Sequence, residues 1–440
     1  MDSKNAQEVI MDCSSGYSFI DNCGEDRTEE NVKVRLTGES LIVSPRLKEP
    51  LLISFRDIIE FCGEDYKIHF NLSSGEELTL CDLGYQYEDF LRIFSMLRNE
   101  LLLKDLLMQE PFRAFGAEVE FVRTDASGTE KEKGICSIRL YQTGIVIMPA
   151  KGEFIRIPYN DISDVCEGNL SVIVNTEQGD KFVLSKMAED LDPFKRGLSD
   201  AINGLSLKVQ SSIKEVVPDC DTSILRKAAR IIKDGKAVKK DDLDPICPAI
   251  WAGLEKKLDI AGVKEEYDFL KSLSPGAGAY IGLKQGLMDA ADYVFFLIPV
   301  YSLDPREPGN ALAMEASSEE DEGKATYFFR ILSRADYPDF KNEKDMTGEI
   351  DGFIKQINCC MLRVNFRREP IYLPDEKLND PRYQRYKFSI AKIPELRFLR
   401  SLFVGRVIHS SLDQWKEDVR ELLKFNVGTV DDKVKWEKGG

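Results

Sequence analysis

The chain has 440 residues, a formal net charge of −16 and a sequence pI of about 4.9, and 43% of its residues are hydrophobic. This length is too great for one hydrophobic core, so we expect roughly two to four domains. The acidic balance argues against bulk attraction to nucleic acid or anionic lipid, unless a local patch overrides it.

The N-terminal residues, MDSKNAQEVIMDCSS, contain neither a basic start nor a long apolar run, so we expect no signal peptide. The longest apolar run, at 293–300, is much shorter than the roughly 20 residues that a membrane-spanning helix needs. The ten cysteines are scattered and form no C-x-x-C pair, which is typical of reduced thiols. We therefore expect a cytoplasmic protein.

Two stretches of the N-terminal half are copies of one another. When the chain is aligned with itself at an offset of 104 residues, positions 35–97 match positions 139–201 without a gap, and 14 of the 63 pairs are identical. Ordinary amino-acid frequencies give roughly four identities by chance. The N-terminal half therefore contains a duplicated domain.

Each copy consists of short segments that alternate apolar and polar residues, with Gly, Asn and Asp between them. In the second copy we predict strands over 118–123, 137–141, 144–149, 153–158, 161–165, 170–175 and 181–185. A helix follows, with Asp192 as its N-cap and Pro193 in its first turn. The first copy ends in a longer helix, over about 87–108.

The stretch SIRLYQTGIVIMPAKGEFIRIPYNDISDV, followed by LSVIVNTEQGDKFVL and a helix, resembles the pleckstrin-homology-like (PH-like) superfamily in its GRAM style. The resemblance covers about residues 14–210 as two tandem copies, and it contains no catalytic motif. It implies two seven-stranded antiparallel barrels, each with a C-terminal helix that closes one open end. Another small all-β barrel, duplicated in tandem, is the alternative. We predict the two domains over 14–110 and 115–214.

Some PH-like domains bind phosphoinositides, and many bind only proteins. A lipid-binding domain of this kind needs several cations in its first loop between strands. Here those loops read DNCGEDRTEEN and TDASGTEKEKG, and in the second Lys131 and Lys133 are offset by adjacent glutamates. Residues 32–104 carry nine Lys or Arg against twelve Asp or Glu, and residues 131–205 carry nine against eleven. We therefore expect protein binding or an architectural role.

The identical charged pairs, Arg35/Arg139 and Asp57/Asp161, recur in both copies. We interpret them as charges on exposed strand faces, paired across the sheet and contributing little to stability.

A mainly helical segment is predicted over 220–290. Positions 226–240 hold the densest cluster of cations in the chain, with Asp234 as their one acidic neighbour: Arg226, Lys227, Arg230, Lys233, Lys236, Lys239 and Lys240. This cluster could bind phosphate groups or an acidic partner, or it could be a solvated helix face followed by a basic turn. The glycine-rich stretch at 274–286 is interpreted as a flexible loop that opens a helix.

A C-terminal α+β unit is predicted over 291–427, so that the fold class is multidomain α+β. We expect strands near 293–302, 310–316 and 324–334, a helix over 349–362, a helical tail over 381–408 and a last helix over 410–425. A third, modified PH-like copy is an open alternative here, although no alignment without gaps supports it.

Residues 363–409 carry eleven Lys or Arg against five Asp or Glu. The candidate cations, interleaved with aromatic residues, are Arg382, Arg385, Arg397 and Arg400. Such a face suits nucleic acid, acidic lipid or an acidic protein surface. It could equally dock on the acidic domains of the same chain.

The chain has two histidines, His69 and His409, which argues against a His-based triad or a multi-His metal site. We expect no catalytic residue, no metal and no cofactor. The first hypothesis is a non-catalytic cytoplasmic adaptor or scaffold with a protein partner. The second is a peripheral anionic-lipid or nucleic-acid binding protein that uses 226–240 and 363–409. The third is an enzyme with an active site in the C-terminal half. The oligomeric state stays open.

Overall fold

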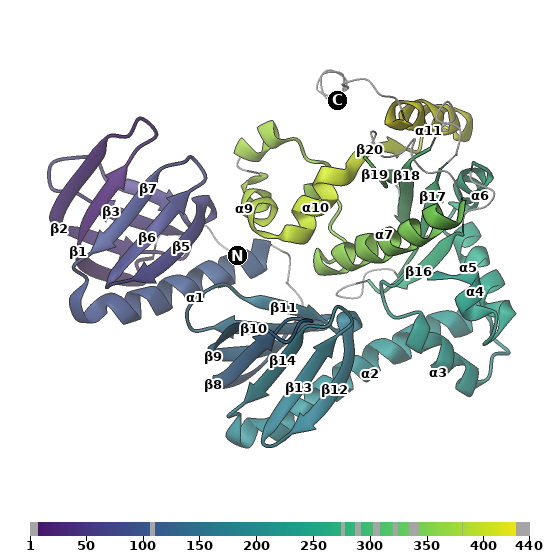
Figure 1. The fold of residues 1–440 in the computed structure, drawn as a ribbon, viewed down its shortest axis with the longest axis horizontal. Helices are drawn as coiled ribbons and strands as arrows, with labels where there is room; N and C mark the ends of the chain where they lie inside the picture. The colour runs from purple at the N-terminus through teal and green to yellow at the C-terminus, as the bar shows by residue number, and fades with distance from the viewer. Residues whose placement is uncertain are drawn as a thin grey trace. The chain divides into compact units, whose positions relative to one another are not determined.

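The computed structural model describes residues 8–105, 111–273, 278–286, 292–301, 309–319, 324–333, 343–380 and 382–427. The chain forms two compact units (Figure 1). The first consists of Met1–Ile157, Ile162–Lys195 and Leu373–Arg397, and the second of Pro158–Asp161, Arg196–Tyr372 and Phe398–Gly440.

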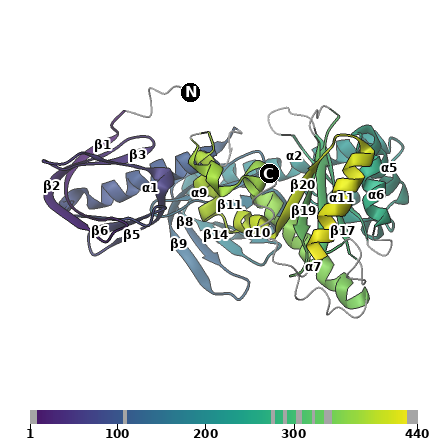
Figure 2. The same cartoon turned by 90° about the horizontal axis from the view of Figure 1, so that it is seen from above.

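The first unit begins with a seven-stranded antiparallel sheet in the order β4-β3-β2-β1-β7-β6-β5. Its strands are β1 (Met11–Ile20), β2 (Asp26–Leu36), β3 (Ser40–Ser44), β4 (Leu51–Ser54), β5 (Ile58–Glu64), β6 (Lys67–Leu72) and β7 (Glu77–Cys81). The sheet curls around helix α1 (Tyr87–Asp105) (Figure 2). Alternation builds this core: in β6, Ile68, Phe70 and Leu72 are buried and the residues between them are not.

A second sheet repeats this topology, in the order β11-β10-β9-β8-β14-β13-β12. Its strands are β8 (Arg113–Thr124), β9 (Glu130–Leu140), β10 (Gly144–Pro149), β11 (Ile155–Pro158), β12 (Ile162–Gly168), β13 (Ser171–Thr176) and β14 (Lys181–Ser185), and helix α2 (Leu191–Val216) follows. The likeness extends to detail, because the register shifts directly after Ile58 in the first copy and after Ile162 in the second. The predicted strands of the duplication are confirmed.

In both sheets the described ladder leaves the fourth and fifth strands at its edges. Each sheet is therefore a curled, open one rather than a barrel closed by hydrogen bonds. A single turn of 3-10 helix connects the two edge strands in each copy: η2 (Phe55–Asp57) and η4 (Tyr159–Asp161). The first unit also contains η7 (Asp375–Asn379) and helix α9 (Gln384–Lys392), which come from the late segment Leu373–Arg397.

The second unit is built on a six-stranded antiparallel sheet whose strands follow chain order. They are β15 (Val238–Lys239), β16 (Tyr280–Lys284), β17 (Tyr293–Val300), β18 (Ala311–Ser317), β19 (Ala325–Arg330) and β20 (Phe403–Ile408). Most of α2, from Arg196 onward, also belongs to this unit. The other helices are α3 (Thr222–Ile231), α4 (Lys240–Leu243), α5 (Pro248–Ile260), α6 (Lys264–Ser272), α7 (Glu343–Arg363), α8 (Glu369–Tyr372), α10 (Pro394–Leu402) and α11 (Leu412–Val427).

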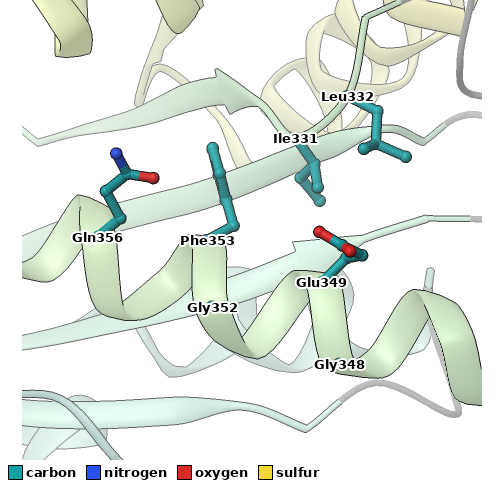
Figure 3. A pocket seen from close by; sticks show the side chains of 7 residues that line it. All are labelled: Ile331, Leu332, Gly348, Glu349, Gly352, Phe353 and Gln356. Atoms are coloured by element: carbon teal, nitrogen blue, oxygen red, sulfur yellow. The ribbon is translucent and has the colours of Figure 1, made fainter.

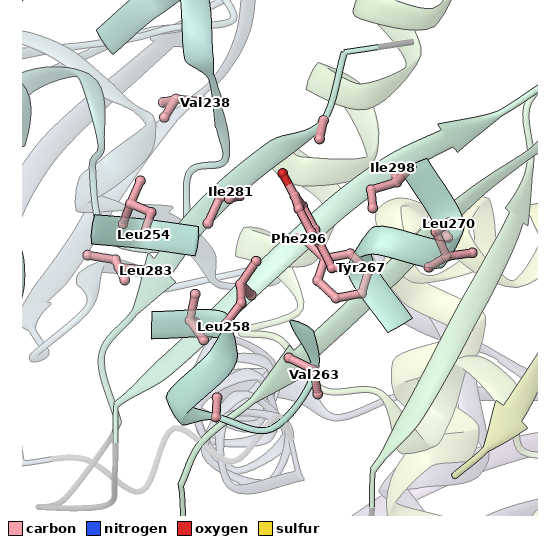
Figure 4. Close-up of a cluster of buried hydrophobic side chains, with 14 of the residues drawn as sticks. Val238, Leu254, Leu258, Val263, Tyr267, Leu270, Ile281, Leu283, Phe296 and Ile298 are labelled. Atoms are coloured by element: carbon pink, nitrogen blue, oxygen red, sulfur yellow. The ribbon is translucent and has the colours of Figure 1, made fainter. Parts of the chain in front are cut away.

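Strand β17 explains why this sheet is covered on both faces. Its sequence, YVFFLIPV, is apolar at consecutive positions, and neighbouring residues point to opposite faces. On one face, the ring of Phe296 lies 5.7 Å from that of Tyr267 on α6, within the core shown in Figure 4. The ring of Phe295 lies 5.1 Å from that of Phe366, which follows α7.

Two predictions in this unit are wrong. Residues Tyr280–Lys284 form strand β16, not a loop that opens a helix, and Gly282 fits there because an added Cβ would lie 2.4 Å from the ring of Phe295. Residues Phe403–Ile408 form the edge strand β20 rather than part of a helical tail. The six-stranded order also differs from that of the first two sheets, so this unit is not a third copy of them.

Some predicted boundaries cannot be compared. The expected end of the first helix near Met108, the domain limit at 110 and the limit at 290–291 lie outside the described residues. Within the described ranges, no helix combines the length and the apolar composition that crossing a membrane requires.

Candidate functional site

The first loop between strands is a closed acidic turn in both copies. Asp21 Oδ1 accepts hydrogen bonds from the backbone N–H groups two and four residues ahead, both at 2.9 Å. Asp125, at the same place in the second copy, makes the same two bonds at 2.9 and 3.0 Å. Gly24 and Gly128 complete the turns with φ of 80° and 81°. The 104-residue offset therefore extends to this loop.

Both carboxylates are held in their charged form. The backbone N–H of Glu25 is the largest cause that lowers the pKa of Asp21, and the hydroxyl of Ser127 is the largest that lowers the pKa of Asp125. In the second loop, Lys131 Nζ lies 3.0 Å from Asp125 Oδ2. A phosphate group at this position would meet a fixed negative charge and a lysine that is already paired.

The 3-10 turns carry the repeated aspartates Asp57 and Asp161. Both residues lie between strands, so the prediction that they are charges on strand faces is wrong for Asp57 and Asp161. Arg35 and Arg139 do lie on strands, β2 and β9. Each aspartate contacts a cation from a late part of the chain, Lys387 or Arg363, and the separations in sequence are 330 and 202 residues.

In the first copy, Lys387 Nζ on α9 lies 3.2 Å from Asp57 Oδ1. Helix α9 packs against η2, α1 and β5. The adjacent Arg56 pairs with other elements: it donates to Asp105 at 2.7 Å and to Glu39 at 2.8 Å. This arrangement ties the end of α1 to the 3-10 turn and leaves Asp57 for Lys387.

In the second copy, Arg363 Nη2 at the end of α7 lies 3.2 Å from Asp161 Oδ2. The side-chain amide of the adjacent Asn160 donates to the backbone oxygen of Asp234. Asp234 is itself buried and lies 2.8 Å from Lys284 Nζ. This turn is therefore part of a buried polar network.

The candidate cations at 226–240 divide into two groups. Arg226, Lys227 and Arg230 are exposed on α3, on the face opposite its buried residues, and Lys240 is exposed at the start of α4. No ion pair involving these four is present among the described residues.

The other three cations of this stretch are less exposed than the first four. Lys233, Lys236 and Lys239 are half-buried. Lys239 Nζ lies 2.6 Å from Asp351 Oδ2, and Lys233 Nζ donates to the backbone oxygen of Asn160 at 3.4 Å.

The arginines of the tail are likewise dispersed. Arg382 pairs with Asp380 in its own turn at 2.7 Å, and Arg385 stacks on the ring of Tyr386. Arg397 is exposed. Arg400 donates to the backbone oxygen of Pro370 at 2.6 Å. Arg382, Arg385 and Arg397 belong to the first unit and Arg400 to the second.

A hairpin turn presents a large apolar side chain at matching positions of the two copies. Tyr66, between β5 and β6, is 76% exposed, and Leu170, between β12 and β13, is 75% exposed. Their φ values are 58° and 52°. Large side chains rarely adopt this left-handed conformation.

A cavity of about 390 Å³ opens beside α7 in the second unit (Figure 3). It is lined by Ile331, Leu332, Gly348, Glu349, Gly352, Phe353 and Gln356. This lining holds one carboxylate and neither a histidine, a lysine nor a cysteine. Among the described lining residues, Glu349 therefore has no second titratable group with which to form an acid–base pair.

His409 lies between two carboxylates in the second unit. Its Nε2 is 3.1 Å from Oε1 of Glu315 on β18, and its Nδ1 is 3.3 Å from Oε1 of Glu266 on α6. The opposite sides of the ring thus face different carboxylates, which do not converge on one point. In the part of the chain that the structure describes, no group of three or more His, Cys, Asp or Glu is arranged to hold a metal ion.

No protein-family model and no curated protein matches the chain. Among solved structures, the chain is similar to one described as the structure of the Spt16D Pob3N heterodimer, with 13% identity and a TM-score of 0.16. The match covers 38% of this chain and 85% of that one. At so low a TM-score the similarity supports neither a fold assignment nor a function.

Proposed function

We propose that this chain is a non-catalytic cytoplasmic adaptor that binds a protein partner through two tandem PH-like domains and its C-terminal unit. The strand order of both sheets, with a helix directly after the last strand, is compatible with the PH-like fold. The observation that carries the proposal is the closed acidic turn at Asp21 and Asp125, because a phosphoinositide would need converging cations there.

The 3-10 turns give a second reason. At Asp57 and at Asp161, an identical residue of both copies takes up a cationic side chain of a polypeptide segment. A position that contacts polypeptide in both copies is suited to a protein partner rather than to a lipid headgroup.

The second hypothesis keeps one specific observation in its favour. Arg226, Lys227, Arg230 and Lys240 are exposed cations that no ion pair neutralises among the described residues. An anionic lipid or nucleic-acid surface would contact this group, and binding would weaken steeply with salt.

Binding of the full chain separates the two hypotheses. It is tested on vesicles that contain phosphatidylserine and phosphatidylinositol bisphosphate, and on a mixed-sequence oligonucleotide, at about 50 and 200 mM salt. The adaptor proposal expects that neither the vesicles nor the oligonucleotide bind at the higher salt. It also expects that the wild type and the R226E/K227E/R230E variant capture the same partner protein to the same extent. Salt-sensitive binding that the triple variant loses would establish the second hypothesis instead.

A further inference from the structure

The two repeated aspartates differ in how deeply they are buried, whereas their cationic partners differ much less. The side chains of Asp161 and Arg363 are 7% and 24% exposed. Those of Asp57 and Lys387 are 45% and 31% exposed, so water competes for this ion pair. The same position in the duplication is thus buried in one copy and accessible in the other.

The described apolar side chains of α9 and the segment before it form a cluster apart from the core of the first sheet. Leu373, Leu378 and Tyr386 form a small cluster of their own, separate from the cluster that surrounds α1. The described apolar side chains of this segment therefore pack mainly on one another, and such a segment can be replaced on η2 by another of similar chemistry.

We infer that η2 of the first domain is an exchange site, which α9 occupies within the chain and which a short cationic helix of a partner protein takes over. The inference rests on the proposed adaptor function and names the chemistry of its partner. The incoming helix resembles α9: a lysine for Asp57, with an aromatic residue beside it like Tyr386. The negative balance of residues 32–104, nine Lys or Arg against twelve Asp or Glu, favours a cationic helix.

Occupation by α9 sets the affinity for the partner. If α9 fills the site about 90% of the time, a competing helix binds about tenfold more weakly than to the vacant site. Loosening α9 without altering Asp57 should therefore tighten binding of a competing helix.

The experiment measures fluorescence anisotropy of a labelled synthetic peptide with the sequence of residues 382–397, added to the full chain. We expect Lys387→Glu in the chain to tighten peptide binding about fivefold or more, because the internal competitor is weakened while the site stays intact. Lys377→Glu makes the same charge change at an exposed position of the same segment and should leave the affinity unchanged. A peptide that itself carries Lys387→Glu should not bind.

Two further variants complete the test. Adding Asp57→Asn to the Lys387→Glu chain should abolish the gain. In the charge-swapped chain, Asp57→Lys with Lys387→Glu, the wild-type peptide should not bind, and the peptide that carries Lys387→Glu should bind with the affinity that the wild-type pair shows. Equal peptide affinity in wild type and Lys387→Glu, or a gain that survives Asp57→Asn, overturns the inference. Sedimentation velocity that shows Lys387→Glu to dimerise also overturns it, since a second copy would then be the occupant. Vesicle and oligonucleotide binding are measured separately, so failure of the adaptor function is distinguishable from failure of the exchange.

Discussion

Oε1 of Glu315, a buried residue in the middle of β18, lies 3.1 Å from Nε2 of His409. Burial alone would lower the pKa of His409, but hydrogen bonds to Glu266 and Glu315 outweigh burial and raise the pKa from 6.5 to about 9. The imidazolium therefore joins α6, β18 and the end of β20 through charge.

The stability of the second unit should consequently depend on pH. Because the pKa of His409 is higher in the folded chain, its contribution is complete below about pH 6.5 and disappears as the pH rises through about 9. We expect the free energy of unfolding to fall by up to about 3 kcal/mol over this range. Urea unfolding of the wild type and of His409→Gln between pH 6 and 10 measures this pH dependence. If the free energy of unfolding changes with pH equally in the two proteins, the prediction is contradicted.

Replacing Leu170 by Gly should stabilise the chain. Leu170 has a φ of 52° and is 75% exposed, so it bears the cost of a left-handed conformation without packing in return. Glycine adopts this conformation freely, and we expect a gain of about 0.5–1 kcal/mol in thermal or urea unfolding. The matched control is Ile135→Gly, a half-exposed residue inside β9, which should destabilise the chain.

Replacing Arg98 by Ala should be far more damaging than replacing its partner Glu153 by Gln. Arg98 is fully buried on α1 and donates to the backbone oxygen of Ile58 at 3.1 Å, while Glu153 is partly exposed. The Ala variant leaves a buried carbonyl without its donor and opens a cavity, which costs about 3 kcal/mol or more. Similar unfolding midpoints of the two variants would contradict this prediction.

The two ion pairs at the 3-10 turns should differ in energy. Arg363→Ala leaves the buried Asp161 short of a cation and should cost about 2 kcal/mol, whereas Lys387→Ala should cost under about 1 kcal/mol because Asp57 remains hydrated. Differential scanning fluorimetry of the two variants provides the comparison. A larger loss from Lys387→Ala would show that the exposed pair is the stronger one.

Two glycines of the second unit should respond oppositely to alanine. A Cβ at Gly282 would lie 2.4 Å from the ring of Phe295 and 2.9 Å from the backbone oxygen of Lys236, so Gly282→Ala should cost about 1–3 kcal/mol. At Gly352 on α7 an added Cβ meets no atom within 4 Å, so Gly352→Ala should stabilise by up to about 1 kcal/mol. Urea unfolding of both variants checks the signs.

The duplicated sheets were predictable because their signal is local and occurs twice. Alternating residues in segments such as KIHFNL, and glycines at equal offsets, specify strands and turns without knowledge of distant contacts. The aligned positions 35–97 and 139–201 already contain the pair Tyr66/Leu170, and extending the 104-residue offset toward the N-terminus would also have found Asp21/Asp125.

The pairing of Asp57 could not be predicted in this way. Its partner, Lys387, is 330 residues away in sequence, and no local sequence pattern distinguishes the lysine that pairs with Asp57 from the other lysines. Strand β20 was missed for a similar reason: the six residues FVGRVI follow a helix directly, and their strand conformation comes from pairing with β19.

The return of Leu373–Arg397 to the first unit also affects the order in which the protein matures during synthesis. A nascent chain that has just left the ribosome with both seven-stranded sheets still lacks α9, because residues 196–372 of the second unit are translated before it. The first unit therefore cannot reach its finished form until this intervening segment has been synthesised, and only then does Asp57 meet its lysine.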